Sequence, residues 1–359
     1  MSKSIFYLSL SFFFCLQLAA QKVDQNKIWK EAEQQLSVLL KSNDWTSGFF
    51  PGMLWMMYER TGKQEWKVAA QEFTALMKRE PYNRNSHDVG FKVYDSYGQG
   101  YRVTKDSSYK KLIIQAAKTL ASRFNPKVGC IRSWDFGKWQ YPVIIDNMMN
   151  LELLFAATKF TGDSSFYRIA VSHANTTLKN HFRSDFSSYH VVDYDTATGQ
   201  VIGKGTHQGY ADESAWARGQ AWALYGYTMC YRETKNKQYL ILAENVASFI
   251  LKNPSLPKDG VPYWDYNVPN KKDEPRDASA ATVTASALYE LATFTGKKAY
   301  RQAADKMLSS IVAKYRAPFG SAHGFLLLHS TGNKPANGEV DEPIIYADYY
   351  FLEALNRMN

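Results

Sequence analysis

Residues 206–227 read THQGYADESAWARGQAWALYGY, and this stretch predicts a helix that begins close to its DES triplet, residues 212–214. Asp, Glu and Ser are residue types that cap or open helices, and an alanine-rich run follows them. On that helix Arg218 and Trp222 are four positions apart, so the two side chains share one face. A fixed cation beside a flat aromatic ring suits a planar, anionic, sugar-like ligand. A capped core helix whose Arg and Trp only support packing gives the same pattern, so both interpretations stay open at this point.

A short turn follows this helix and recurs along the chain. In each copy a Thr stands five residues before an aromatic residue, with Gly, Lys, Asp, Asn or Ser between the two. A segment with Ala and aliphatic residues at helical spacing then follows, which predicts an amphipathic helix. The five copies run from Thr61 to Trp66, Thr104 to Tyr109, Thr161 to Phe166, Thr234 to Tyr239 and Thr295 to Tyr300. The segment from Trp29 has the same helical pattern without the turn, which makes six amphipathic helices.

A second kind of helix alternates with the first, and it is richer in aromatic and small residues and poorer in charge. A helix that is apolar all round is a buried one. We place these helices at residues 51–59, 87–103, 143–160, 214–233, 279–294 and 344–356. Six buried and six amphipathic helices in alternation predict an all-α fold, the closed double ring called an (α/α)6 barrel. An open helical solenoid would share the alternation, but no obviously polar pair caps either end, which favours closure.

The longer, irregular connections precede the buried helices and are rich in Tyr, Trp, His, Gly and Asp. Long connections in a compact domain are often functional. They run over residues 43–50, 125–141, 183–213, 253–277 and 318–343. If they meet at one end of the ring, they form a cleft at the N-terminal ends of the inner helices. Those ends carry partial positive charge and free N–H groups, which attract an anion.

The first residues and the charge of the chain indicate an exported protein with an anionic partner. Residues 1–20 combine Lys3, a largely apolar run and small residues at the end, which predicts a cleaved signal peptide. Residues 21–359 then form a single catalytic domain without membrane insertion, because the apolar run is too short for a typical span. We expect a periplasmic or secreted protein. Its net charge of +9 is spread along the chain and not gathered in a basic stripe, which argues against nucleic acid and favours acidic glycans.

Cysteines and histidines give no sign of a metal site. Cys130 and Cys230 could pair in an oxidising compartment, but the sequence cannot give the distance between them. No C-x-x-C motif occurs, and His87, His190 and His207 lack the spacing of metal ligands.

Two carboxylates stand where buried helices are expected to begin. Asp88 lies in SHDVGF, where it is most simply a helix-start residue. Asp146 lies in the apolar stretch PVIIDNMMNL, and unpaired carboxylates are almost never fully buried. Burial would raise the pKa of Asp146, as a general acid needs, whereas the helix start would lower it, and the sequence does not decide between them. Asn147 or Asn150 could satisfy the carboxyl group.

Together these stretches resemble the unsaturated glucuronyl hydrolases, glycoside hydrolase family 88. The matching stretches are DWTSGFFPG from Asp44, SHDVGF from Ser86, IIDNMMN from Ile144, HQGYADESAWARGQAW from His207 and YADYYFLEAL from Tyr346. The resemblance covers nearly all of the mature chain, and the stretch from His207 is its most specific part. The family fold is an (α/α)6 barrel, which agrees with the repeats counted above.

The resemblance implies an enzyme that removes a 4,5-unsaturated uronic acid from the non-reducing end of acidic oligosaccharides made by polysaccharide lyases. It implies hydration of the C4=C5 double bond, with Asp146 as the acid that protonates C4 and then as the base that activates the water adding at C5. Asp88 is implied as the second essential carboxylate. No cofactor and no metal are needed, because the ring oxygen already polarises the double bond. The positive charge agrees with sulfated substrates, but the parent polymer stays open among chondroitin, heparin, ulvan and gellan.

The resemblance also implies a set of substrate-binding residues. They are Trp45, Phe49, His87, Trp134, His190, His207, Gln208, Arg218, Trp222 and Tyr346. Among them Arg218 is the expected partner of the uronate carboxylate, because its planar fork can bind a carboxylate through two hydrogen bonds. Trp45 and Phe49 match an aromatic wall. Ser330 and Lys334 are placed where a sulfate on the next sugar would lie.

Two other functions fit the same residues. An unsaturated rhamnogalacturonyl hydrolase would share the fold and the chemistry and differ in the neighbouring sugar. An exported protein that binds acidic glycans without catalysis would need the cationic groups only. The two carboxylates favour an enzyme over such a binding protein, because a protein that only binds anions gains nothing from them.

Overall fold

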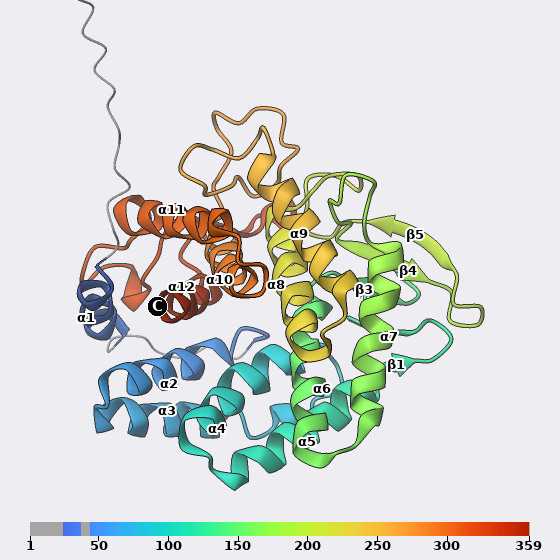
Figure 1. Cartoon of the computed structure of the whole chain (residues 1–359), viewed down its shortest axis with the longest axis horizontal. Coiled ribbons are helices and arrows are strands. Elements are labelled where there is room, and N and C mark those ends of the chain that lie inside the picture. The colour runs from blue at the N-terminus through green and yellow to red at the C-terminus, as the bar shows by residue number, and fades with distance from the viewer. Residues whose placement is uncertain (1–23, 37–43, 359) are drawn as a thin grey trace, which may run out of the picture.

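Two concentric rings of helices make up the computed structural model, which describes residues 24–36 and 44–358 (Figure 1). The inner ring contains α2 (Phe49–Thr61), the π-helix η2 (Gly90–Gly98) that continues as α4 (Gln99–Thr104), α6 (Asn147–Thr161), α8 (Ala217–Thr234), α10 (Ala278–Thr295) and α12 (Ile345–Arg357). The outer ring contains α1 (Gln25–Leu36), α3 (Gln64–Leu76), α5 (Ser107–Ala121), α7 (Ser164–Asn180), α9 (Lys237–Lys252) and α11 (Lys298–Lys314). The predicted signal peptide, residues 1–20, lies outside the described residues.

The inner ring is closed. Each inner element packs against the next in chain order, from α2 to η2, α6, α8, α10 and α12, and α12 returns to α2. Inner helices such as α8 and α10 are buried along almost their whole length, whereas outer helices such as α9 bury only one face. An open solenoid would leave its first and last pairs apart, so the (α/α)6 barrel predicted from the repeats is confirmed.

The recurring Thr turns join each inner helix to the outer helix that follows. In each turn the Thr hydroxyl donates back into the inner helix and accepts the backbone N–H two residues later, at 3.1–3.3 Å. The residue directly after each Thr takes the left-handed conformation, which Gly62, Gly162 and Gly296 adopt without a steric cost. Three of the outer helices then begin with an Asp or Asn whose side chain caps them. Hydrogen bonds of one local motif therefore set the reversals of the chain.

Three of the inner elements begin three or four residues later than predicted, since η2 starts at Gly90 instead of residue 87, α6 at Asn147 instead of 143 and α8 at Ala217 instead of 214. Residues 143–146 were expected to be helical, but β3 (Pro142–Ile144) is a strand paired with β4 (Val191–Tyr194), because Val143 and Ile144 suit a buried strand. The DES triplet at residues 212–214 does not cap α8, which starts at Ala217. The backbone of residues 216–217 instead bonds to residues 264–265 of another loop, which holds the segment extended.

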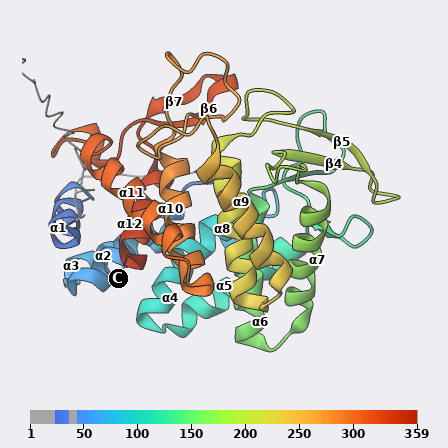
Figure 2. The same cartoon turned by 45° about the horizontal axis from the view of Figure 1, so that its top comes forward.

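The irregular connections gather at one end of the ring, where the inner helices begin. β4 also pairs with β5 (Val201–Gly205), and a separate hairpin joins β6 (Ser330–Asn333) to β7 (Gly338–Glu342). Figure 2 shows both of these hairpins at this end of the ring. A third two-stranded sheet joins β1 (Phe124–Asn125) and β2 (Cys130–Ile131). The N-terminal ends of the inner helices are thus surrounded by long loops, as the sequence predicted.

The two cysteines of the described chain are not paired. Cys130 in β2 and Cys230 in α8 are both free thiols, and both are buried. Burial raises the pKa of the Cys130 thiol to about 12, so it stays protonated and unreactive. In the described part of the chain, no helix is both long enough and apolar enough to cross a membrane.

Candidate active site

Asp146 lies at the junction between strand β3 and helix α6. The backbone N–H of Ile145 bonds to the carbonyl of His190 at 3.0 Å, so the pairing of β3 with β4 brings His190 beside Asp146. Asp146 is the residue before the first turn of α6, but its side chain makes no capping bond. Only 8% of the residue is exposed. The carboxyl group therefore lies at the N-terminal end of α6, and it is not used as a helix cap.

Burial decides the pKa of Asp146. It raises the pKa to about 7, and the nearby charge of Asp88 adds to the rise. The positive charge of the Arg218 guanidinium acts in the opposite direction, but it does not outweigh burial. About half of the Asp146 carboxyl groups therefore carry a proton at neutral pH, as a general acid requires.

His190 presents one defined nitrogen to Asp146. Its Nδ1 accepts the backbone N–H groups of His207 and Gln208 at 3.1 and 3.2 Å, so the single proton of the neutral ring sits on Nε2. That Nε2 lies 3.7 Å from Oδ2 of Asp146. The ring also packs on Trp216 at a centroid distance of 4.5 Å. Burial holds the pKa of His190 well below its usual range, so the neutral form persists at physiological pH.

Asp88 belongs to a chain of polar side chains that ends on helix α6. Its Oδ2 accepts the hydroxyl of Ser86 at 2.7 Å, and its Oδ1 lies 3.3 Å from Nε2 of His87. Nδ1 of His87 in turn lies 3.4 Å from the amide of Asn150. Asn150 is one turn after Asp146, so a single helix fixes both carboxylates relative to each other.

The sequence suggested that Asn147 or Asn150 bonds to the carboxyl group of Asp146, but neither of them does. The amide of Asn147 donates to the carbonyl of Ile131 at 2.8 Å and to the hydroxyl of Ser133 at 3.1 Å. The side-chain oxygen of Asn150 accepts the backbone N–H of Phe91 at 2.9 Å. Both asparagines hold neighbouring segments together instead.

Arg218 is engaged by the protein itself. Its Nη1 donates to Asp277 at 2.9 Å and to the carbonyl of Thr331 at 2.6 Å, and its Nη2 donates to the carbonyl of Gly332 at 2.6 Å. The residue is 1% exposed. These bonds use Nη1 and one N–H of Nη2, whereas Nε has no partner among the described residues, so only the Nε–Nη2 edge is left for the predicted two-bond contact with a substrate carboxylate. Arg218 also ties the β6–β7 hairpin to α8 and α10.

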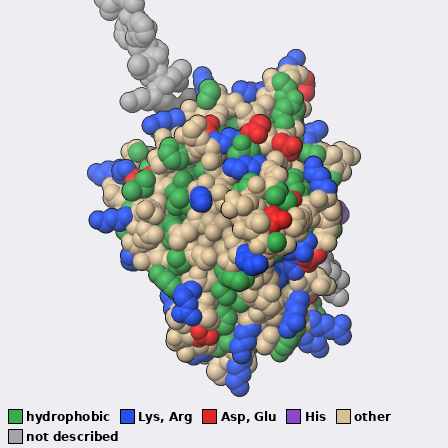
Figure 3. All heavy atoms as spheres, turned by 90° about the vertical axis from the view of Figure 1, so that its right-hand side faces the viewer, with side chains coloured by type: hydrophobic (Ala, Val, Ile, Leu, Met, Phe, Trp, Pro, Cys, Tyr) green, Lys and Arg blue, Asp and Glu red, His purple; other side chains and the backbone are tan. Residues whose placement is uncertain are grey.

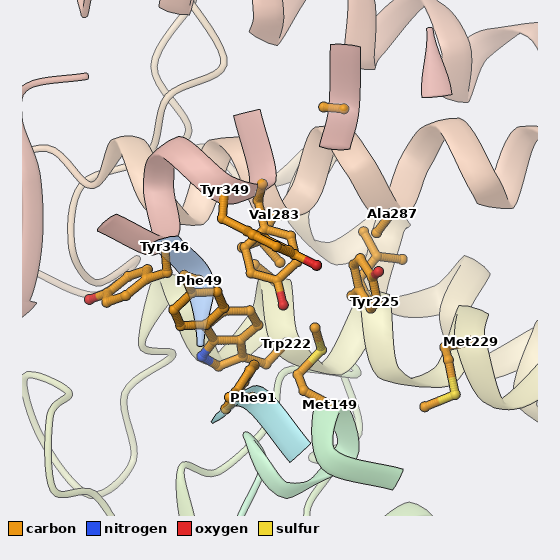
Figure 4. Packing of buried hydrophobic residues seen from close by; sticks show 14 of the residues in the cluster. Phe49, Phe91, Met149, Trp222, Tyr225, Met229, Val283, Ala287, Tyr346 and Tyr349 are labelled. Carbon is orange, nitrogen blue, oxygen red and sulfur yellow. The ribbon is translucent and has the colours of Figure 1, made fainter. Parts of the chain in front are cut away.

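An aromatic cluster that includes Phe49, Phe91, Trp222 and Tyr346 is buried between the inner helices (Figure 4). Trp222 lies 5.4 Å from Phe91 and 6.4 Å from Tyr346, and the ring of Trp45 lies 5.1 Å from Tyr346. Phe49 is completely buried and packs against Phe91 and Tyr346, so it supports this cluster. The predicted aromatic wall therefore does not include the surface of Phe49, whereas Trp45 is only partly buried.

Loop residues form the other side of the site. The ring of Trp134 lies 5.4 Å from the imidazole of His207 and stacks on Phe136, which is 60% exposed. The side-chain amide of Gln208 donates to the carbonyl of Gly332 at 3.0 Å. The hairpin β6–β7 and the connection before α8 are thereby joined around the predicted site.

Several buried polar atoms of these residues have no hydrogen-bond partner within residues 24–36 and 44–358. They are Oδ2 of Asp146, Nε2 of His190, Nε1 of Trp222, Nε of Arg218, the hydroxyl of Tyr346 and Nε1 of Trp134. Buried polar groups are nearly always bonded in folded proteins, and unpaired ones are costly. Such a concentration among the predicted site residues indicates a place built to receive a polar ligand.

Three further residues support the site and were missed from the sequence. Trp216 packs on His190 and lies 4.4 Å below the guanidinium of Arg218. Asp277, which caps α10, also pairs with Arg218 at 2.9 Å. In the sequence, only its position directly before the Ala- and Ser-rich start of a predicted helix could have indicated its capping role. Burial raises the pKa of Glu339 on β7, and the positive charge of nearby Arg218 offsets only part of this rise. Within the described chain, no three His, Cys, Asp or Glu side chains come together as a metal site.

Known proteins resemble this chain over most of its length. Residues 19–230 match the family model of Glycosyl Hydrolase Family 88. An unsaturated glucuronyl hydrolase of Formosa agariphila is 56% identical over 88% of this chain and 80% of its own length. An unsaturated chondroitin disaccharide hydrolase of Streptococcus pneumoniae is 35% identical over 89% of this chain and 83% of its own.

A solved structure agrees with these sequence matches. The crystal structure of an unsaturated glucuronyl hydrolase specific for heparin is 46% identical, covers 93% of this chain and 96% of its own, and superposes with a TM-score of 0.90. The sequence and the fold therefore lead to one conclusion: this chain belongs to glycoside hydrolase family 88 and is a glycosidase.

Proposed function

We propose that this enzyme removes the 4,5-unsaturated uronic acid from the non-reducing end of acidic oligosaccharides, by hydrating the C4=C5 double bond. The observation that carries the proposal is the buried carboxyl group of Asp146, whose pKa is raised to about 7 and whose Oδ2 has no partner among the described residues. The names of the relatives, unsaturated glucuronyl and chondroitin disaccharide hydrolases, support the same reaction.

In the first step Asp146 gives its proton to C4 of the sugar. The electrons of the double bond form the new C–H bond, and the positive charge that develops at C5 is shared with the ring oxygen. Asp146 becomes a carboxylate and is then able to accept a proton from a water molecule that adds at C5. The product is a hemiketal at C5. Its ring opens by breaking the bond between C5 and the ring oxygen, which leaves a ketone at C5 and a hemiacetal at C1, and this hemiacetal then expels the next sugar as an alcohol and becomes an aldehyde. The proton returns to Asp146, so the cycle closes without a cofactor.

The neighbouring groups hold this chemistry in place. His190 keeps its Nε2 proton directed at Asp146, which stabilises the carboxylate formed after proton transfer. Asp88 is held by Ser86 and lies beside His87, which suits a carboxylate that orients sugar hydroxyl groups and stabilises positive charge at C5. Trp45 is partly exposed and offers an aromatic face on which sugar rings commonly stack, whereas Trp134 is 7% exposed and stacks on Phe136.

The charge of the protein favours an acidic, sulfated substrate. Lys and Arg side chains are spread over the face shown in Figure 3 and do not form one patch, as expected for a protein that binds small anionic fragments. Lys334 on the β6–β7 hairpin is partly exposed and is our candidate for a sulfate contact. Ser330 does not suit that role, because it is completely buried. We further propose that the chain is exported, on the basis of residues 1–20.

A panel of substrates tests the proposal. Fragments made by lyases from chondroitin, heparin, ulvan, gellan and rhamnogalacturonan are incubated with the enzyme, and loss of the ultraviolet absorbance of the C=C–COO⁻ group is followed. We expect loss with unsaturated glucuronyl fragments. Turnover of rhamnogalacturonan fragments alone would identify the related hydrolase. Tight binding of intact acidic chains without any loss of absorbance would identify a binding protein and refute the proposal.

A further inference from the structure

A half-open cavity lies along the ring axis, at the end where the inner helices finish and opposite to the β hairpins. This cavity has a volume of about 620 Å³ and is bordered by α2, η2, α4, α6, α8 and α12. Its walls include the side chains of Tyr94, Asp95, Glu152, Tyr225 and Glu353. The volume falls within the range of about 300–1,000 Å³ that is usual for small-molecule sites.

A layer of aromatic rings separates the cavity from the candidate active site. Phe91 and Tyr350 border the cavity, and both rings lie 5.4 Å from the ring of Trp222 on the other side. Tyr350 also lies 5.1 Å from Tyr349, which borders the cavity as well. The cavity is therefore a compartment of its own and not an extension of the catalytic residues.

Carboxyl groups outnumber the buried cations around this cavity. Arg232 pairs with Glu152, with Glu233 at 3.0 Å and with Glu290 at 2.7 Å. Arg357 pairs with Glu290 at 3.2 Å and with Glu353 at 3.5 Å. Of these glutamates only Glu152 and Glu353 border the cavity, so together with Asp95 three inner carboxyl groups face two guanidinium groups. Lys159 reaches Glu233, but from the surface, where its side chain is 65% exposed.

The mouth of the cavity is different from its interior. Arg102 at the mouth pairs with Glu59, and both side chains are well exposed. The ammonium group of Lys105 lies 5.7 Å from the ring centre of Tyr101. These cations lie close to water, which screens their charge, so they do not offset the carboxylates deeper inside.

Asp95 is the group that lacks a countercharge. Its Oδ1 lies 3.3 Å from the hydroxyl of Tyr349, whereas its buried Oδ2 has no partner among the described residues. Burial and the charges of Glu353 and Glu152 raise the pKa of Asp95 well above its usual range. A positive charge placed beside Asp95 would be stabilised by all three carboxyl groups.

The arrangement suits an organic cation and not a metal ion. No three potential metal ligands come close enough to hold a metal anywhere in the part of the chain that the structure describes. The carboxyl groups are instead spread around a wide space lined with Tyr94, Tyr225 and Tyr349. Aromatic faces combined with carboxylates are a common way to bind ammonium groups.

We propose that this cavity is a second binding site, which takes a small organic ammonium ion with its nitrogen beside Asp95 and its carbon chain against the tyrosine rings. The site is independent of the hydrolase reaction, because no residue assigned to catalysis borders it.

Calorimetric titration of the whole enzyme with putrescine, a diammonium ion, tests the proposal, and 1,4-butanediol of the same length is the uncharged comparison. We expect saturable binding of putrescine and none of the diol. Asp95→Asn, which removes the charge and keeps the shape, should weaken binding at least tenfold. Glu65→Gln, at an exposed position of the outer helix α3, is the matched control and should bind like the wild type.

Failure to detect saturable binding of putrescine by the wild type would overturn the proposal, and so would equal binding by Asp95→Asn. If Asp95→Asn does not fold, Tyr349→Phe removes the hydroxyl beside Asp95, and a crystal of the wild type soaked in putrescine locates the ligand directly. Density in the cavity supports the site, whereas density only beside Asp146 contradicts it.

Discussion

The Nε2 proton of His190 faces the Oδ2 atom of Asp146 across 3.7 Å, because the other ring nitrogen accepts two backbone N–H groups. This distance is longer than a hydrogen bond, and Oδ2 has no other partner among the described residues. The carboxyl group is therefore close to a group that stabilises its anion, yet it is free to give up its proton to a ligand. Catalytic hydrogen bonds are often long before the substrate binds.

Activity should depend on the protonated form of Asp146. Since burial raises its pKa to about 7, the acid is protonated below that pH and loses its proton above it. We expect kcat/KM to fall about tenfold for each pH unit well above 7. Burial keeps His190 neutral in the same range, so its titration should not add a loss between pH 5 and 7. A kcat/KM that rises with pH through 7 would contradict the assignment.

The same pKa predicts a cost in stability. The folded state holds the proton of Asp146 up to about pH 7, whereas an Asp in the unfolded chain, with its ordinary pKa of 3.8, releases it near pH 4. The native state therefore loses stability as the pH rises from about 4 to 7. Asp146→Asn should remove this cost, by up to about 4 kcal/mol at pH 8 and by little near pH 4.

Urea unfolding at the two pH values measures the difference. Glu65→Gln, at an exposed position, is the control and should stay within about 0.5 kcal/mol of the wild type at both. An Asp146→Asn variant that is less stable than the wild type at pH 8 would show that the carboxyl group is not strained by burial.

Arg218 should matter for the integrity of the site. Its pair with Asp277 is buried, and its removal takes the donor from Oδ2 of Asp277 and one donor each from the carbonyls of Thr331 and Gly332. We expect Arg218→Ala to reduce the free energy of unfolding by about 3–5 kcal/mol. Lys297→Ala breaks a pair whose lysine is 56% exposed and should cost less than about 1 kcal/mol. Equal losses in the two variants would rule out the anchoring role.

Replacing His190 should slow the reaction without abolishing it. Asn in this place lacks the ring that rests on Trp216 and directs a proton at Asp146. We expect kcat to fall by less than the roughly 10²–10⁴-fold that a proton donor contributes. His323→Asn, at an exposed position far along the chain, should leave kcat unchanged. Wild-type kcat in the His190 variant would mean that its orientation toward Asp146 is unimportant.

The architecture was readable from the sequence because local hydrogen bonds specify it. The Thr turns at residues 61, 104, 161, 234 and 295 each contain a Thr hydroxyl that accepts a backbone N–H and a left-handed residue, and three of them also contain a capping Asp or Asn, so about six residues specify each reversal. The burial of Asp146 was also predictable, since three apolar residues precede it. The sign of its pKa shift was not, because it depends on the balance between burial and the charges of Arg218 and Asp88.

Features that depend on partners far away in the sequence could not be predicted from it. The strand at residues 142–144 forms because β4 lies beside it, about 50 residues later in the chain. The whole guanidinium of Arg218 looked available for a ligand, whereas Thr331 and Gly332, more than 110 residues away, take up its Nη1 and one N–H of its Nη2. Phe49 was assigned to the ligand surface by similarity, whereas its neighbours bury it completely.

The most direct measurement compares the wild type with Asp146→Asn on an unsaturated glucuronyl disaccharide, by following the ultraviolet absorbance of its conjugated double bond. Loss of activity by about a thousandfold or more, with substrate still bound, is the predicted result, because the amide cannot supply the proton to C4. Turnover within tenfold of the wild type would contradict the role of Asp146 and, with it, the proposed mechanism.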